Sequence, residues 1–150
     1  MSVSFRDSAD SDKAQVFGGA KMALFVGARI LTILRDDFDH IPWPGSWDFP
    51  GGGREEGESP LECVLRETQE EVGLIVPDGC IRWSRPYLSE SDRKWFFAAH
   101  LPATCETEIA LGSEGQCWEL VSVDAFLSRD KAIPFLQTRL SDYLAGSGAS

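Results

Sequence analysis

The fold of this 150-residue chain is decided by the stretch Gly51-Gly-Gly-Arg-Glu-Glu-Gly-Glu-Ser-Pro-Leu-Glu-Cys-Val-Leu-Arg-Glu-Thr-Gln-Glu-Glu-Val-Gly73. Its opening glycines favour tight, unusual backbone over a regular element. A helix is predicted to follow, because Ser59 is a good N-cap, Pro60 suits the first helical position and Glu62 completes a capping box. Gly73 is a natural end for that helix.

The predicted helix has an apolar stripe at helical spacing. The stripe is expected to face the core, and it consists of Leu61, Val64, Leu65, Thr68 and Val72.

Three glutamates lie on a different face of the same helix. Glu67, Glu70 and Glu71 stand at i, i+3 and i+4, where like charges destabilise a helix by roughly 0.2–0.5 kcal/mol per pair. Hard oxygen ligands on a rigid element suit Mg²⁺ or Mn²⁺. Taken alone, however, such a group is more often a solvated acidic face than a metal site. The choice between the two depends on the other residues of the stretch and on their spacing from the glutamates.

That spacing is Gly52-x5-Glu58-x7-Arg66-Glu67-x2-Glu70-Glu71-x-Gly73. It resembles the Nudix box, the signature of the Nudix hydrolases. One position departs from the family pattern: Thr68 stands where an aliphatic residue is usual. We expect its methyl group to pack in the core and its hydroxyl to bond the carbonyl one turn back.

The resemblance extends roughly from Met22 to Leu144. It implies an α/β (α+β) fold of the Nudix type, an α/β/α sandwich with a mixed β-sheet between helices, which agrees with the order of predicted elements. Expected strands are 22–26, 30–34, 47–49, 80–88, 93–101 and 116–121, the first two joined as a hairpin by Gly27-Ala28-Arg29, and further helices are 123–127 and 133–144. The expected organisation is a flexible arm at 1–20, the domain at 21–145 and a flexible tail at 146–150.

The resemblance also implies roles around a metal site. Glu70 and Glu71 would ligate divalent metal, and the Gly51 carbonyl resembles a backbone ligand of the MutT type. Glu67 would be the general base or a further ligand. In the stretch Ser113-Glu-Gly-Gln116, Glu114 would complete the site.

The remaining expected roles of the box concern positioning and substrate. Arg66 would hold the glutamates, and Glu58 would lie near the metals or pair with Arg66. The residues expected to bind substrate are Arg35, Gly52, Gly53, Trp47 and Phe49. The residues considered for an aromatic shelf under a base, or else for the core, are Trp43, Trp47, Phe49, Trp95 and Phe97.

The charge balance bears on partners. Lys and Arg total 14 against 24 Asp and Glu, a net charge of −10, which repels nucleic acid unless the cations cluster. No cluster is visible in the sequence, so we expect a small-molecule nucleotide or other diphosphate substrate and no nucleic acid. The absence of a signal peptide and of a long apolar run favours a cytoplasmic protein without a membrane partner. Monomer and homodimer both remain open.

The function that the resemblance implies is metal-dependent hydrolysis of a nucleoside diphosphate linked to another group, with water attacking a phosphorus. The short chain and the Ser113–Gln116 context favour a MutT-like nucleoside triphosphate pyrophosphohydrolase. The alternatives are a nucleotide sugar, dinucleoside polyphosphate or other such substrate, and a non-catalytic nucleotide-binding regulatory module. MutT-type enzymes that clear oxidised guanine nucleotides read the base with an asparagine. The stretch 133–138 has none, and Gln137 is the candidate substitute.

Overall fold

A mixed β-sheet forms the centre of the protein. The computed structural model describes residues 16–88 and 92–147, so most of the expected N-terminal arm lies outside the described residues. The strands are β1 (Gly19–Val26), β2 (Arg29–Leu34), β3 (Trp47–Asp48), β4 (Gly51–Gly53), β5 (Ile81–Leu88), β6 (Arg93–Leu101) and β7 (Cys117–Val121). The main path runs β3-β2-β1-β6-β5, with β4 paired to β1 and β7 paired to β2.

The pairing directions make the sheet mixed. β1 runs parallel to β6 and antiparallel to β2, so the predicted hairpin is confirmed. β1 lies at the centre and is buried on both faces. Met22 and Leu24 point to one apolar cluster, whereas Ala23 and Phe25 point to the other, as the alternation of a strand requires.

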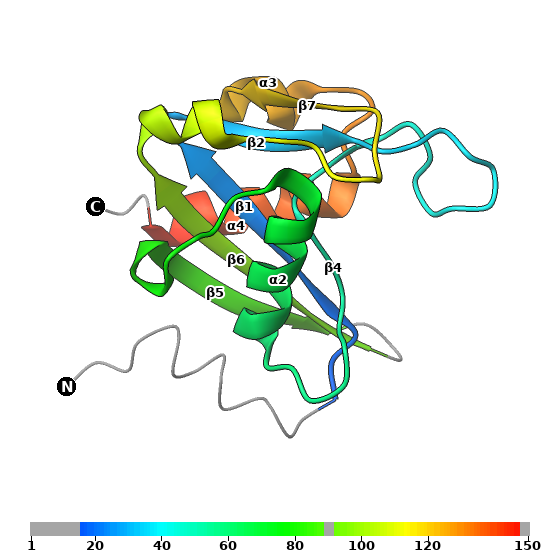
Figure 1. Ribbon diagram of the computed structural model, residues 1–150, viewed down its shortest axis with the longest axis vertical. Coiled ribbons are helices and arrows are strands. Elements are labelled where there is room, and N and C mark those ends of the chain that lie inside the picture. Colours follow the sequence, from blue (N-terminus) through cyan, green and yellow to red (C-terminus); the bar gives the residue numbers. More distant parts are fainter. Residues whose placement is uncertain (1–15, 89–91, 148–150) are drawn as a thin grey trace.

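Helices cover both faces of the sheet, which confirms the predicted sandwich. They are α2 (Pro60–Val72), α3 (Val123–Ser128) and α4 (Pro134–Ser147), with short 3₁₀ turns η2 (Asp78–Cys80) and η3 (Ala103–Glu108). Figure 1 shows α2 in front of the sheet and α4 behind it, and the two apolar clusters divide in the same way. No helix within residues 16–88 and 92–147 is long and apolar enough to cross a membrane.

The ends of α2 confirm the sequence prediction. Ser59 and Glu62 form the reciprocal capping box, and Gly73 ends the helix in the left-handed conformation with φ 74°. Thr68 is fully buried, as expected of the apolar stripe. Its expected hydrogen bond to the preceding turn is wrong, because the Thr68 hydroxyl has no partner among the described residues.

Two expectations about boundaries and glycines need correction. β1 begins at Gly19 and α4 continues to Ser147, so the folded domain reaches beyond the expected limits of 21–145 at both ends. Gly51–Gly53 was expected to fit no regular element, yet it forms strand β4 against β1. Glycine is required there because a Cβ on Gly51, at φ 139°, would overlap the Ala20 carbonyl oxygen.

The unpaired hydroxyl of Thr68 gives a stability prediction. Thr68→Val keeps the shape of the side chain and removes a buried polar group without a partner, so we expect about 1 kcal/mol of added stability in urea denaturation. Thr32→Val is the matched control, because Thr32 is equally buried but donates a 2.7 Å hydrogen bond to the Glu119 carbonyl. That variant should be destabilised. If both variants change the free energy of unfolding in the same direction, this explanation of the Thr68 hydroxyl is contradicted.

Candidate active site

Two glutamates of α2 meet the glycine strand. The backbone N–H of Gly51 donates a 2.8 Å hydrogen bond to the Glu71 carboxylate. Glu67 lies against the next residue, since a Cβ on Gly52 would be 2.5 Å from its Oε1 atom. Only a glycine strand allows this close approach. The structure therefore brings together Glu67, Glu71, Gly51 and Gly52 from the predicted site.

Arg66 links this edge of α2 to the preceding loop. Its guanidinium donates to both carboxylate oxygens of Glu58, to Glu67 at 3.0 Å and to the Gly53 carbonyl at 2.9 Å. Burial alone would raise the pKa of Glu58, but the Arg66 hydrogen bond and the Glu55 N–H lower it below its ordinary value. The expected pairing of Arg66 with Glu58 is thus present.

Glu70 differs from its two neighbours. Its side chain is 57% exposed, against 18% for Glu67, and its hydrogen bond is to Arg66 at 3.1 Å. The three glutamates that look equivalent on a helical wheel therefore occupy distinct environments. Glu67 and Glu71 lie against the backbone, and Glu70 lies at the solvent side.

Lys21 is a site residue that the sequence analysis missed. Its ammonium group donates to the Gly51 carbonyl at 3.2 Å and to Asp48 at 2.9 Å. The signal was present in the sequence as a single lysine inside an apolar strand. A cation thus already contacts the carbonyl that was expected to ligate metal, beside the Glu71 carboxylate.

The oxygen donors at this edge fit a hard divalent cation. Glu71 accepts the Gly51 N–H, Glu67 lies against Gly52 and the Gly51 carbonyl contacts Lys21, although no three His, Cys, Asp or Glu side chains among the described residues already form a metal-holding group. Glu114 lies in the same 240 Å³ cavity as Glu71. Its loop is fixed there, because Gly112 N–H donates to the Glu71 carbonyl and Gly115 N–H donates to Asp36.

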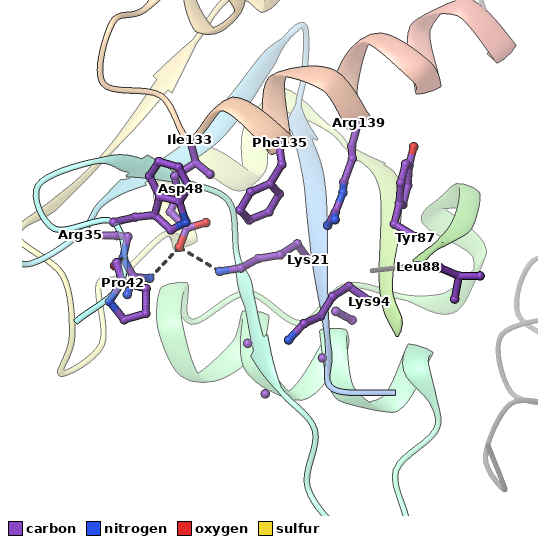
Figure 2. A pocket seen from close by; sticks show the side chains of 15 residues that line it. Lys21, Arg35, Pro42, Asp48, Tyr87, Leu88, Lys94, Ile133, Phe135 and Arg139 are labelled. Carbon is purple, nitrogen blue, oxygen red and sulfur yellow. Dashed lines mark hydrogen bonds and ion pairs between the residues drawn. The ribbon is translucent and has the colours of Figure 1, made fainter. Parts of the chain in front are cut away.

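A second cavity of 430 Å³ shares Arg35 and Asp48 with the first and is drawn in Figure 2. The predicted substrate residues Arg35, Gly52 and Gly53 line it. Lys21, Lys94 and Arg139 line it as well. The folded protein therefore does have a cluster of cations, although none was visible in the sequence. They come from separate strands and a helix, which is why no run of charge reveals them.

The aromatic residues divide between core and cavity. Phe49 has no exposed surface and stacks on Phe126 in the core, so its predicted role in substrate binding is wrong. Trp95 and Phe97 are also buried. Trp47 is half-buried under the Arg129 guanidinium and does not line either cavity described above.

Trp43 alone of the five proposed aromatics lines the larger cavity, where it meets the edge of Phe135. Gln137 is directed elsewhere. Its amide donates to carbonyls of Phe126, Leu127 and Arg129, so it is engaged in packing α3 and not in reading a base.

The electrostatics of Glu71 give a prediction for the metal-free protein. Burial raises the pKa of Glu71 to about 7, and Lys21 and the Gly51 N–H only partly oppose the rise. As the pH rises from 4.5 towards 7, the unfolded chain releases this proton while the folded protein keeps it. The free energy of unfolding therefore falls over this range, and it stays lowered above pH 7, where the buried Glu71 carboxylate is charged in the folded protein.

Glu71→Gln should therefore be more stable than the wild type at pH 8 by about 1–3 kcal/mol in urea denaturation with chelator. The difference should shrink towards zero at pH 4.5. Glu70→Gln is the control, because it removes a charge from the same helix at a side chain that is 57% exposed. A wild type that is the more stable protein at pH 8 would contradict the assignment.

Known proteins resemble the chain in fold. The crystal structure of a MutT protein from Methanosarcina mazei superposes with a TM-score of 0.65 at 19% identity, covering 82% of this chain and 88% of that one. A Caenorhabditis elegans Ap4A hydrolase binary complex superposes with a TM-score of 0.61 at 20% identity, covering 87% and 99%. At these identities the likeness establishes the fold alone.

One sequence relative and one family model complete the comparison. An RNA pyrophosphohydrolase of Tolumonas auensis is 35% identical over 47% of this chain and 51% of its own length, so the chain spans about half of that relative. The model of the NUDIX domain matches residues 20–142, most of the chain, and the protein therefore belongs to the NUDIX domain family.

Proposed function

We propose that the protein is a divalent-metal-dependent hydrolase of a nucleoside diphosphate linked to another group. The observation that carries the proposal is the convergence of Glu67 and Glu71 on the glycine strand, beside a 430 Å³ cavity with cationic walls. Acidic side chains hold metal and cationic ones hold phosphate, so hydrolysis of a diphosphate uses both. Family membership supports the same reaction class.

The proposed ligands are oxygen atoms from three parts of the chain. Glu67, Glu70 and Glu71 extend from α2, the Gly51 carbonyl comes from β4, and Glu114 comes from the loop before β7. Bound Mg²⁺ or Mn²⁺ would lower the pKa of a water molecule and neutralise charge on phosphate oxygens. Binding there would require Lys21 to share or release the Gly51 carbonyl, which it contacts at 3.2 Å.

The protein side chains then handle the proton and the geometry. Glu67 is in reach of the strand where the diphosphate would lie, and it accepts the proton of the attacking water or serves as a further ligand. Arg66 and Glu58 position Glu67 through their ion pairs. Arg35 lines both cavities and is proposed to contact phosphate.

The finer substrate proposal is a MutT-like reaction that converts a nucleoside triphosphate to a monophosphate and pyrophosphate. The second candidate is the triphosphate end of an RNA. It is favoured by the similarity to RNA pyrophosphohydrolases and by the gathering of four cations at the larger cavity. This candidate replaces the expectation that nucleic acid is excluded. Nucleotide sugars and dinucleoside polyphosphates complete the substrate panel.

The test is product release from that panel with Mg²⁺ or Mn²⁺. Glu67→Gln, Glu70→Gln and Glu71→Gln should each lower kcat by about 10²-fold or more, the order found when one key electrostatic group is removed. Glu56→Gln is the control, because Glu56 is an exposed residue of the same segment. A wild type that yields no metal-dependent product would favour the non-catalytic module, and unchanged variants would refute the site.

A further inference from the structure

Arg139 lies in the wall of the larger cavity and has no anionic partner among the residues that the structure describes. It extends from α4, and its guanidinium lies over the rings of Tyr87 and Phe135 at 4.5 Å and 4.6 Å from their centroids. Burial lowers the pKa of Arg139, and Tyr87 only partly opposes this effect. Across residues 16–88 and 92–147, no hydrogen bond or ion pair engages its N–H groups, whereas a half-buried charge ordinarily finds one.

The other cations of this cavity are already paired. Lys21 and Arg35 share one carboxylate oxygen of Asp48, at 2.9 Å and 3.0 Å. Lys94 pairs with Asp92 at 3.0 Å. Arg139 therefore has donors to offer to a ligand without first breaking an ion pair.

The aromatic contacts restrict what Arg139 can recognise. Figure 2 shows that its side chain extends from α4 into the cavity, between Phe135 and Tyr87. The two ring contacts use none of the N–H groups of the guanidinium, and these groups form a rigid planar fork of donors. Such a fork matches two acceptors that lie side by side on a planar group.

The surroundings favour a flat, largely apolar group over another phosphate. Phe135 lies beside Arg139 and meets Trp43 at 6.1 Å between centroids, and Pro42 and Ile133 also line the same cavity. Aromatic and aliphatic walls stabilise a stacked base, whereas a phosphate would lose its hydration there. The opposite end of the cavity reaches Gly52 and Gly53, where the diphosphate is proposed to lie.

We infer that Arg139 reads the base of the substrate and selects one that presents two adjacent acceptors. Guanine does so through N7 and O6, and cytosine does so through N3 and O2. Neither adenine nor uracil presents two adjacent acceptors on one edge, so neither can satisfy the fork. The inference rests on the proposed function, and it adds a preference for guanine and cytosine nucleotides over adenine and uracil nucleotides.

The experiment compares GTP, CTP, ATP and UTP as substrates with Mg²⁺. The wild type should favour GTP and CTP by about tenfold in kcat/KM, in line with the discrimination of a bidentate arginine contact. Arg139→Met should bring the four values close together, mainly by lowering those of GTP and CTP. Arg139→Lys keeps the charge but not the fork and should lose the preference as well, which covers the case of a Met variant that does not fold.

Arg85→Met is the matched control, because Arg85 also lies over the Tyr87 ring, at 5.0 Å, but is not among the residues lining the cavity. It should keep the preference. Equal loss for all four nucleotides in Arg139→Met would identify a phosphate contact and overturn the inference, as would a wild type without preference. Calorimetric binding of the same nucleotides without metal separates the two proposals, because a base preference in binding survives even if no nucleotide is hydrolysed.

Discussion

The guanidinium of Arg66 holds the acidic edge of the site together. Glu58 and Glu67 are only 14% and 18% exposed, and both carboxylates bond to it. Without a cation, half-buried like charges would repel and would lose hydration that nothing replaces. The same guanidinium bonds the Gly53 carbonyl, so it also fixes α2 against β4. The approach of Glu67 and Glu71 to the glycine strand depends on that attachment.

Asp48 is the counterpart of Arg66 on the cationic side. Its carboxylate is 6% exposed and holds Lys21 from β1 and Arg35 from the end of β2, while its other oxygen accepts the Phe49 N–H. One buried anion thus fixes two cations at the boundary of the two cavities. The boundary places positive charge beside the acidic edge, and a diphosphate needs both kinds of charge to be held and attacked.

The distribution of charge also explains why the bulk composition was misleading about partners. A net charge of −10 describes the whole chain, whereas the larger cavity is lined by four cations, Lys21, Arg35, Lys94 and Arg139. An acidic exterior with a cationic hollow favours approach of phosphate at that hollow and disfavours it elsewhere. Net charge alone therefore excludes no class of phosphate-bearing partner here.

The sequence by itself determined what depends on neighbouring residues. The capping box, the Gly73 stop and the apolar stripe of α2 follow from local periodicity and backbone chemistry, and the hairpin follows from two apolar runs around Gly27. The sequence likewise predicted that Glu67, Glu70 and Glu71 lie on one helix, and the spacing of the box predicted the family to which the protein belongs.

Only the tertiary structure decided which of those residues meet distant ones. Gly51–Gly53 forms a strand because it pairs with β1. Phe49 lies in the core because Phe126 of α3 packs against its ring. Lys21 and Arg139 joined the cavity from elements more than a hundred positions apart in sequence. Strand pairing and helix packing set such distances, and neither leaves a local pattern in the sequence. The burial of Glu71 and the place of Arg139 in the cavity wall therefore appear only in the folded chain.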